Sequence, residues 1–457
     1  MRDLPDLSLA ELEPHQEIPL FAGKTWKWSP SSWSIREDAQ NDIEALGLAA
    51  FSFYQAIERL YLKSKKGEKI LRNHDLKVPW VADYFDNGKP GWLVEHSISR
   101  QVLGTMPAVL RPDLLPTANG FALTEWDAVP GGIGLTAFLN EIYLGKDYSS
   151  MVDSFGESLK SACEANENND SKFAIVVSQE AETYLPEMEW LAEKLRLKDY
   201  WVQVCSPSDL TITESGVFLN GERIGLLYRF WELFDHEQVP EMKEFARLVE
   251  EEKLVITPPM RPFQEEKLSL ALFHHHRLQA FWDENLSRDE LLLLRRIIPK
   301  TWILDPAIVP PGAVVNGPLV KGEPLGNWMD LAKASKKERI LIIKASGFHE
   351  TAWGARSVVV GDDLSSDEWT LALVTVLKSY PNPVSILQEF RKPVRLEHPV
   401  FNEQGKAEPM KGRLRLSPYY FVCRGKAKWV GALATFCPAD KKIIHGMKDG
   451  ALIPCSH

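Results

Sequence analysis

Apolar positions recur along this chain, and the first regular pattern has the spacing of a helix. Between Asp42 and Leu62 apolar side chains return every three or four residues, which predicts an amphipathic helix. Residues 1–40 are rich in Pro, Ser and Trp, and we expect them to form an irregular arm laid over a domain. A further short helix is expected at residues 97–110. The first 110 residues therefore read as an N-terminal arm followed by a helical region.

Two short strands are predicted directly after this helical region, at residues 111–115 and 121–126. The sequence Thr117-Ala-Asn119-Gly120 between them contains an Asn-Gly pair, which favours a tight turn. Such a turn would join the strands into an antiparallel hairpin. We expect the hairpin to place Asp113 near Glu125.

A regular alternation of strands and helices follows residues 164–172, a polar stretch that is typical of a linker. Strands are predicted at 173–177, 200–205 and 224–228, and helices at 184–195 and 239–250. Short links from strand to helix to strand imply parallel pairing, so we expect a small Rossmann-like unit with a parallel sheet. Because no Gly-x-Gly-x-x-Gly follows the first strand, we expect no dinucleotide site there.

The C-terminal part of the chain combines helical patterns with several strands. Helical patterns extend to about residue 300, including a long one at 265–282. Strands are predicted at 339–344, 357–360, 384–390 and 414–424, with a helix at 367–378 that starts at the capping sequence Ser365-Ser-Asp-Glu. The chain is thus expected to have four parts, at 1–110, 111–165, 170–255 and 256–457, in a mixed α/β fold.

Composition restricts the classes of function. A length of 457 residues indicates two or three domains, and a net charge of −10 argues against a nucleic-acid partner. The five cysteines are scattered without Cys-x-x-Cys spacing, so neither a disulfide framework nor a zinc site is expected. The chain has no apolar run of membrane-spanning length and no visible secretory signal, so we expect no membrane partner and a cytoplasmic location. The sequence predicts no oligomeric state.

Carboxylates gather on the predicted hairpin. Glu125 and Asp127 are two residues apart and point to one face of a strand, where Asp113 of the partner strand can join them. Oxygen ligands of this kind suit Mg²⁺, which is usually shared between carboxylates and the phosphates of a substrate. The alternative is a set of solvated charges, against which the apolar flanks and the following Pro130-Gly-Gly turn argue. Arg111 is either an ion-pair partner of Asp113 or a guanidinium placed for a phosphoryl group.

Two lysines and a glycine-containing loop lie far downstream and could hold phosphate groups. Lys344 ends an apolar strand, and the glycines at Gly347 and Gly354 would let backbone amides approach phosphate oxygens. No Walker A sequence accompanies them, so Lys344 could instead be an edge charge. Lys267 heads an apolar run and could be a surface lysine whose stem lies along apolar neighbours.

Three further groups are open to two interpretations each. Gln388, Glu389 and Phe390 end an apolar strand that could hydrogen-bond an adenine ring or simply reach the surface. Arg229 ends a strand of the α/β unit and could meet a carboxylate substrate or form a structural ion pair. Arg413 and Arg415 are weaker candidates of the same sort.

The run His274-His275-His276 invites a metal-site interpretation. Consecutive residues of a helix point in three directions, however, and cannot chelate one ion together. We therefore expect no metal site at these histidines.

The order of these groups resembles the circularly permuted ATP-grasp ligases, and especially the synthetase fold of glutathionylspermidine synthase. Arg111-Pro-Asp113 and Glu125-Trp-Asp127 match the family's Arg-x-Asp and Glu-x-Asn at the same separation. Weaker matches follow at Lys267, at Lys344 with its loop through Gly354, and at Leu387–Phe390. The resemblance extends from residue 110 to the end of the chain, as separate islands.

The resemblance implies ATP and Mg²⁺ as cofactors, and it implies an enzyme that joins a small-molecule carboxylate to an amine through an acyl phosphate. Asp113, Glu125 and Asp127 would bind Mg²⁺, and Arg111 would stabilise the acyl phosphate and the tetrahedral species that follows it. The remaining ATP contacts would come from the phosphate-binding Lys267 and Lys344, the loop glycines Gly347 and Gly354, and the adenine-lining Gln388, Glu389 and Phe390. Arg229 would bind substrate.

Two departures from the family pattern keep alternatives open. Asp127 stands where the family has Asn, and the loop Gly347–Gly354 is longer and bulkier than the family's compact loop. Both departures favour a nucleotide-binding protein that has lost turnover. A phosphotransferase that stops at a phosphorylated product is the other alternative.

Overall fold

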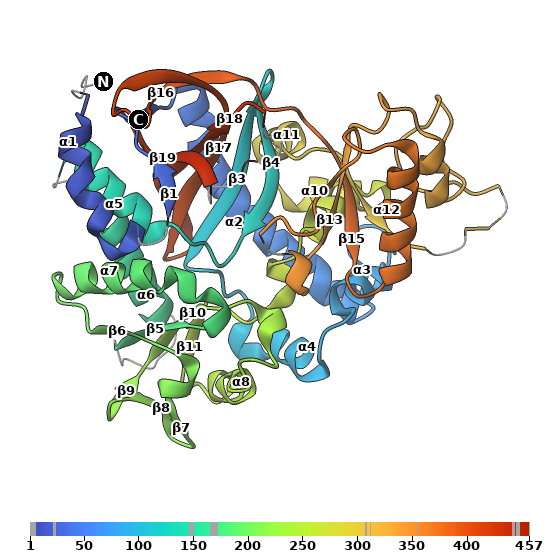
Figure 1. The fold of residues 1–457 in the computed structure, drawn as a ribbon. Helices are drawn as coiled ribbons and strands as arrows, with labels where there is room; N and C mark the ends of the chain where they lie inside the picture. The colour runs from blue at the N-terminus through green and yellow to red at the C-terminus, as the bar shows by residue number, and fades with distance from the viewer. Residues whose placement is uncertain are drawn as a thin grey trace.

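The computed structural model describes residues 6–21, 24–145, 150–164, 172–306, 309–310, 312–352, 354–440, 444 and 448–456. Its largest element is an eight-stranded sheet with the main strand order β1-β19-β18-β17-β3-β4, to which β16 adds beside β17 and β2 beside β19 (Figure 1). The strands are β1 (Thr25–Lys27), β2 (Trp33–Ser34), β3 (Val109–Thr117), β4 (Gly120–Asp127), β16 (Leu396–Phe401), β17 (Ala407–Cys423), β18 (Lys426–Pro438) and β19 (Lys448–Ser456).

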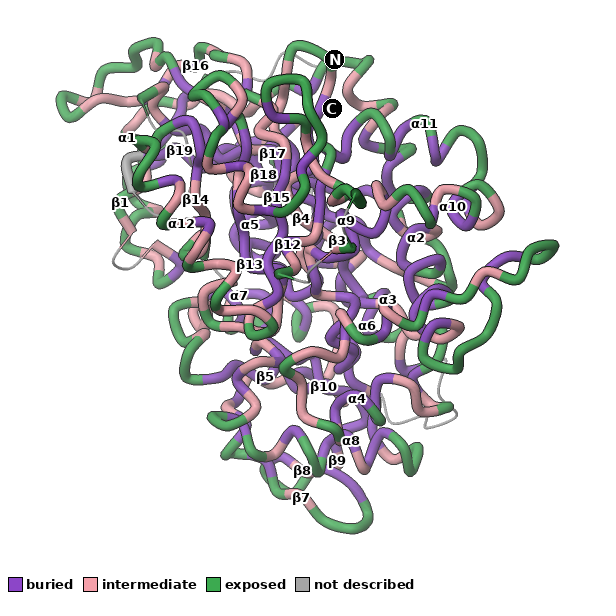
Figure 2. Tube along the Cα trace, turned by 90° about the vertical axis from the view of Figure 1, so that its right-hand side faces the viewer, coloured by how far each residue is buried: buried purple, intermediate pink, exposed green. Residues whose placement is uncertain are grey.

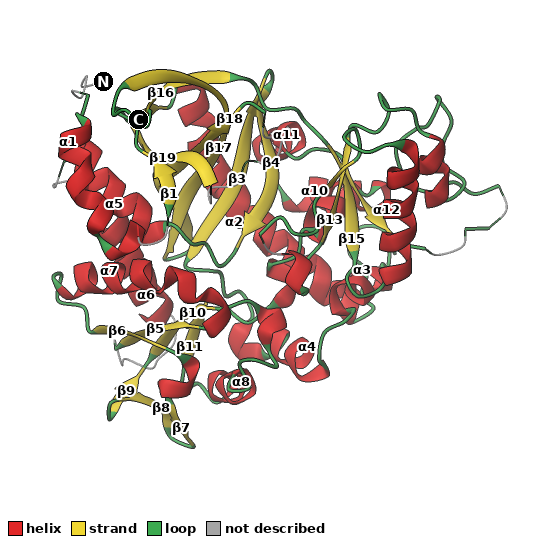
Figure 3. Ribbon diagram, viewed as in Figure 1, coloured by secondary structure: helices red, strands yellow, loops and turns green. Residues whose placement is uncertain are grey.

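Helices cover both faces of this sheet and create two separate apolar cores. On one face lie α2 (Glu37–Lys65) and α11 (Arg288–Ile297), and on the other lie α5 (Ile133–Leu144) and α6 (Ser150–Glu164) (Figure 3). Leu110 and Leu114 of β3 pack into the α2 core, whereas Val109 packs into the α5 core. Because strand side chains alternate between faces, Arg111 and Asp113 fall on the α5 side.

A second sheet lies below the first in Figure 1 and has the strand order β11-β10-β5-β6, with every pair parallel. It consists of β5 (Phe173–Val177), β6 (Val202–Cys205), β10 (Leu226–Phe230) and β11 (Val255–Thr257), with helices α7 (Leu185–Arg196) and α8 (Met242–Glu250). The predicted strands and helices of this region correspond to β5, α7, β6, β10 and α8, and their parallel pairing is confirmed, whereas β11 was not predicted. A small antiparallel sheet of β7 (Thr211–Thr213), β8 (Gly216–Leu219) and β9 (Glu222–Ile224) adjoins it and was not predicted.

A third sheet, antiparallel, occupies the right of Figure 1 and has the order β12-β15-β13-β14. Its strands are β12 (Thr301–Leu304), β13 (Leu341–Ala345), β14 (Val359–Val360) and β15 (Ser385–Glu389), accompanied by helix α12 (Ser366–Ser379). Ser365 caps α12 by accepting from Glu368 N, while the Glu368 carboxylate accepts from Ser365 N at 2.8 Å. The capping signal in the sequence is therefore confirmed.

Two helix predictions are wrong at specific breaking residues. The helix expected at 97–110 is replaced by the end of α4 (Gly91–Ser97) and one short 3-10 turn, because Gly104 has a φ of 75° and Pro107 cannot continue a helix. The long helix expected at 265–282 is divided into α9 (Leu268–His274) and α10 (Gln279–Asn285), because His275 is extended.

The N-terminal arm is more regular than its composition predicts. After α1 (Leu9–Leu12), its strands β1 and β2 both pair in parallel with β19, so the two termini lie at one end of the molecule (Figures 1 and 2). The helical region continues through α3 (Pro79–Asp86), which packs on α2. Residues 165–171 of the predicted linker lie outside the described residues. Within the described ranges no helix combines the length and apolarity that crossing a membrane requires.

Candidate active site

The β3–β4 hairpin brings the predicted charged residues together. Its register pairs Arg111 with Asp127 and Asp113 with Glu125, with an irregularity directly after Asp113. The apolar residues that alternate with these charges, such as Leu110 and Trp126, are anchored in the α2 core. The predicted hairpin and the predicted closeness of Asp113 to Glu125 are thus confirmed.

Arg111 is surrounded by carboxylates and by the Gly-Gly turn that precedes α5. Its Nη2 donates to Asp127 Oδ2 at 2.6 Å, its Nη1 donates to the Gly131 carbonyl at 2.8 Å, and its Nε lies 3.4 Å from Asp113 Oδ1. Burial opposes the charge of Arg111, but Asp127 and Asp113 outweigh it and raise the pKa of the guanidinium well above its ordinary value. Arg111 is therefore a permanent positive charge beside the hairpin.

Asp113 is held inside the molecule by several partners. Only 1% of the residue is exposed, and its carboxylate accepts from Ser417 Oγ at 2.8 Å and pairs with Arg415 Nη1 at 3.1 Å. Asp127 is less enclosed, and burial raises the pKa of its carboxyl despite the opposing charge of Arg111. Of the described residues that line the adjacent cavity, Asp127 is one and Asp113 is not.

This cavity, of about 80 Å³, forms where four segments that are distant in the sequence meet. They are the end of β4, the chain after β10, the residues before α9 and the loop after β13. The charged residues of its lining are Glu125, Asp127, Glu232, Glu265 and Lys267, and the loop contributes Gly347, Phe348, Ala352 and Gly354. Most of the residues that the sequence assigned to metal and phosphate binding therefore share one cavity.

Lys267 and Glu125 form an ion pair across this cavity. Lys267 Nζ lies 3.2 Å from Glu125 Oε2 and donates to the Ala352 carbonyl at 3.2 Å. Burial would raise the pKa of Glu125, but Lys267 and Lys344 outweigh it and lower that pKa to about 2. The pKa of Lys267 is raised because Glu125 more than compensates for burial. Both groups are charged at neutral pH.

Lys344 lies behind the cavity wall, at the end of β13. Its Nζ donates to the Thr124 carbonyl at 3.0 Å and to Gln388 Oε1 at 3.1 Å, and burial lowers its pKa to about 8. The Gln388 amide also donates to Thr301 Oγ1 at 3.1 Å, so its hydrogen bonds are made within the third sheet. Among the described lining residues, none of Gln388, Glu389 and Phe390 is included.

Arg229 is fully buried below the cavity. Its Nε donates to the Pro258 carbonyl at 2.9 Å, its Nη1 donates to the Trp231 carbonyl at 2.6 Å, and its Nη2 pairs with Glu265. Burial lowers the pKa of this guanidinium to about 10. These contacts favour the structural alternative for Arg229, because they fix Glu265 in the cavity wall.

Sequence reasoning missed three carboxylates near the site, and one of them is Glu265 in the cavity lining. Glu232 lines the cavity just after β10, and burial together with Asp127 raises its pKa to about 7. Glu187 of α7 accepts from Gly134 N at 3.0 Å at the start of α5, and burial raises its pKa to about 7. A position just after the carboxyl end of a parallel strand was the signal for Glu232, because ligands bind at that edge.

The carboxylates fit a metal ion only in part. Among the described residues, no group of three or more His, Cys, Asp or Glu side chains is arranged to hold a metal. Glu125 and Asp127 supply two hard oxygen donors to the cavity, but Lys267 and Arg111 already pair with them. Two carboxylates suffice for Mg²⁺ when phosphate oxygens complete its shell. The donor set therefore fits Mg²⁺ bound together with a nucleotide, and does not fit Mg²⁺ alone.

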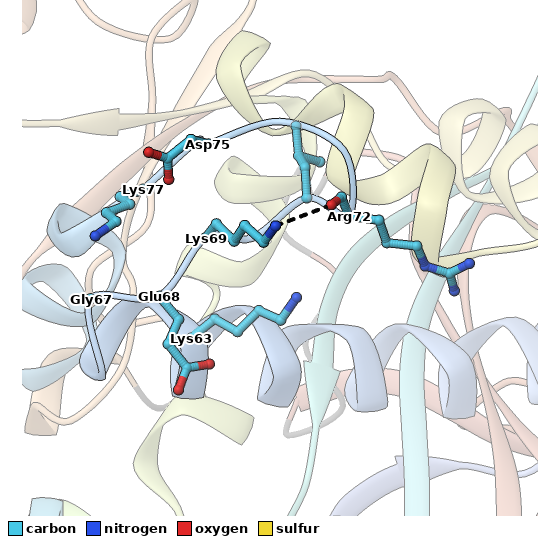
Figure 4. Close-up of a pocket in the computed structure, with 8 residues that line it drawn as sticks. Lys63, Gly67, Glu68, Lys69, Arg72, Asp75 and Lys77 are labelled. Atoms are coloured by element: carbon cyan, nitrogen blue, oxygen red, sulfur yellow. Dashed lines mark hydrogen bonds between the residues drawn. The ribbon is translucent and has the colours of Figure 1, made fainter.

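A larger cavity, of about 550 Å³, opens at the end of α2, away from these residues (Figure 4). Its charged lining comes from a single stretch of chain, namely Lys63, Glu68, Lys69, Arg72, Asp75 and Lys77. Figure 4 shows Lys69 reaching the Arg72 carbonyl, to which it donates at 3.3 Å, while Lys77 points away. Within the described lining, no residue that the sequence assigned to a site is present.

Solved structures resemble this chain although its sequence has no recognisable match. No protein-family model matches the sequence, and no curated protein matches it. A glutathione synthetase-like effector from Globodera pallida, solved in its apo form, matches with a TM-score of 0.57 at 10% identity, over 98% of this chain and 95% of that protein. The two proteins share a fold. A candidate gamma-glutamylcysteine synthetase from Methylobacillus flagellatus KT gives a TM-score of 0.46 at 12% identity, over 89% of this chain and 87% of that one.

The mixed α/β architecture fits the ATP-grasp-like fold class that the sequence predicts. The circular permutation within that class stays a prediction, as do the four domain boundaries.

Proposed function

We propose that this protein is an ATP- and Mg²⁺-dependent ligase that forms an amide between a small-molecule carboxylate and an amine. The observation that carries the proposal is the convergence of Glu125, Asp127 and Lys267 with a glycine-containing loop around one cavity. The fold shared with a glutathione synthetase-like protein supports it. A circularly permuted arrangement like that of glutathionylspermidine synthase, divided at 1–110, 111–165, 170–255 and 256–457, is part of the same proposal.

The charges around the cavity suit a polyphosphate. Glu125 and Asp127 would hold Mg²⁺ with the nucleotide, and the ion would neutralise phosphate charge. Lys267 would exchange its contact with Glu125 for a phosphate oxygen, and Lys344 would add positive charge from behind the wall. Gly347 and Gly354 would let the loop backbone approach the phosphates. Phosphoryl transfer needs mainly such positioning and charge stabilisation.

Two further groups suit the substrates, namely Glu232 in the cavity lining and Arg111, which is outside the described lining but pairs with the lining residue Asp127. Arg111 keeps its charge at any working pH and would stabilise the negative oxygens of an acyl phosphate on the carboxylate substrate. The amine must be neutral to attack, and the Glu232 carboxylate, with a pKa of about 7, could accept its proton. In this proposal Arg229 supports the cavity wall through Glu265. Adenine would bind at the end of β15 after that edge rearranges, in contact with Gln388, Glu389 and Phe390.

Phosphate release measured against sets of carboxylates and amines would test the ligase proposal. A ligase releases phosphate from Mg-ATP only when carboxylate and amine are both present, and hydroxylamine in place of the amine gives a hydroxamate. A phosphotransferase would instead accumulate a phosphorylated product without any amine. Glu125→Gln should abolish the release because it removes a charged metal donor. Undiminished ATP consumption in Glu125→Gln and Lys267→Met would refute the site.

A nucleotide-binding protein without turnover is the second candidate function. Asp127 in place of the family's Asn and the long loop Gly347–Gly354 favour it. The existing ion pairs of Glu125 and Asp127 favour it as well. In this case Mg-ATP would raise the melting temperature, while no combination of carboxylate and amine would release phosphate.

A further inference from the structure

The loop after β13 closes one side of the cavity. We call residues Ser346–Ala352 the cavity loop; Gly347, Phe348 and Ala352 of this loop line the cavity. The cavity volume of about 80 Å³ is smaller than the roughly 300–1,000 Å³ of pockets that hold small molecules, so a nucleotide needs part of the lining to move. The contacts that hold the cavity loop in place therefore control access.

The first residues of the loop are fastened to the segment before α9. The Ser346 carbonyl accepts from Lys267 N at 2.9 Å, and Ser346 Oγ accepts from Leu268 N at 2.8 Å. The same hydroxyl donates to Glu266 Oε2. A Cβ atom at Gly347 would lie only 3.1 Å from Glu266 Cδ, so the loop backbone packs directly on this carboxylate.

The second oxygen of Glu266 is bound by a lysine from a distant part of the chain. Lys89, in the link between α3 and α4, places its Nζ 2.6 Å from Glu266 Oε1, and both side chains are only 3% exposed. Removal of one partner from such a buried pair leaves a charge without compensation, which is strongly unfavourable. One oxygen of Glu266 is thus bound by Lys89 of the N-terminal region, and the other oxygen binds Ser346 of the cavity loop.

Lys89 also contacts the loop itself. Its Nζ lies 5.2 Å from the centre of the Phe348 ring, within cation–π range, and that ring packs on the apolar core of the parallel-sheet unit. Phe348 has a φ of 45°, which is unfavourable for a residue with a side chain and persists only where the surroundings impose it. Release of the Phe348 ring would therefore let the loop backbone relax into another conformation.

We propose that Lys89 is a positioning residue that keeps the cavity loop closed, through its ion pair with Glu266 and its contact with the Phe348 ring. The closed loop is the resting state, and separation of Phe348 from Lys89 is the step that admits ligand. This inference deepens the proposed function. The identity of the ligand that enters rests on the proposed function, whereas the role of Lys89 in holding the loop does not.

Hydrogen–deuterium exchange of the segment 345–356 tests the proposal without any ligand. We expect Lys89→Met to speed exchange there by roughly tenfold, the factor that loss of one cation–π contact corresponds to. The double variant Lys89→Met/Glu266→Gln should do the same without leaving a lone buried carboxylate. Phe348→Leu, which keeps the ion pair, should also speed exchange, and Lys89→Arg should restore slow exchange. Lys65→Met is the matched control, because its partially exposed ion pair with Asp86 lies in the same region but does not contact the loop.

Unchanged exchange of the loop in both the double variant and Phe348→Leu would overturn the proposal. A second readout is the association rate of Mg-ATP, which should rise in these variants relative to wild type and Lys65→Met. If Mg-ATP fails to bind the wild-type protein, the proposed function fails while the exchange result still decides the role of Lys89. Faster exchange with an unchanged association rate would refute loop opening as the step that admits ligand.

Discussion

The two cavities differ in origin as well as in size. The smaller one is built by segments from four distant parts of the chain, and its charges face each other as buried or half-buried pairs. The larger one is formed by one stretch at the end of α2, and its lysines bond mainly to nearby backbone carbonyls. Volume alone would select the larger cavity, whose described lining contains none of the residues that the sequence assigned to a site.

The smaller cavity also differs from the larger one in the electrostatics of the groups around it. Burial shifts the pKa values of Glu232 and Lys344 around the smaller cavity, whereas Lys267 and Lys344 outweigh burial and lower the pKa of Glu125. Groups with shifted pKa values gather at functional sites more often than elsewhere.

The largest effect is expected from Arg229→Met, below the smaller cavity. It removes donors from three buried carbonyls and leaves Glu265 unpaired, so the free energy of unfolding should fall by about 3–5 kcal/mol. Urea denaturation measures this change. Arg247→Met, which breaks exposed ion pairs in the same unit, should change stability by less than about 0.5 kcal/mol. Near-normal stability of Arg229→Met with weakened substrate binding would instead assign Arg229 to the substrate.

Lys267→Met should have the next largest effect. It removes the cation that faces Glu125 and the proposed phosphates, so Mg-ATP affinity should fall roughly 100-fold, or about 2–3 kcal/mol. Isothermal titration calorimetry measures the affinity, with Lys69→Met in the larger cavity as the control. Equal affinities for the two variants would remove the distinction between the cavities.

The third effect is a dependence on pH through Lys344. Its pKa of about 8 lies below the ordinary 10.5, so the charged form is lost as pH rises through 8, and Mg-ATP affinity should fall by up to about tenfold between pH 7 and 9. The free energy of unfolding should change in the opposite direction. Between about pH 8 and 10.5 Lys344 is protonated in the unfolded chain but not in the folded one, so folding becomes more favourable as pH rises. Lys344→Met should abolish both trends, and their persistence would assign them to another group.

The smallest effect is expected in the larger cavity. The double variant Lys69→Met/Lys77→Met removes exposed charges, so the free energy of unfolding should change by less than about 0.5 kcal/mol. Mg-ATP binding should be unaffected. A clear loss of nucleotide binding in this variant would make the cavity at the end of α2 the nucleotide site.

Local sequence signals predicted the hairpin and the parallel sheet well. An Asn-Gly turn between apolar strands predicts the hairpin and its pairing near the turn, such as Thr117 with Gly120. The irregularity after Asp113 shifts the register by one residue, so the turn alone does not predict the pairing of Asp113 with Glu125. The apolar strand β5 and its flanking helix pattern likewise identify the parallel sheet. These features depend on residues close together in the sequence.

Features that depend on distant contacts were not predictable. The extended backbone at His275 interrupts a helical pattern that continues on both sides. Gln388 forms hydrogen bonds with Lys344 and Thr301 because β15 lies between β13 and β12. These strands become neighbours only in the folded sheet. Lys89 and Glu266 lie far apart in the sequence, and nothing in their local sequences links them.

The contact between Lys344 and Thr124 ties the third sheet to the residue that precedes Glu125. Its acceptor is a main-chain carbonyl, which every amino acid provides. Replacement of the Thr124 side chain would therefore leave the connection intact, and only position 344 could reveal it by mutation. Displacement of the third sheet should accordingly pull on the backbone of β4 itself, whichever residue evolution places there.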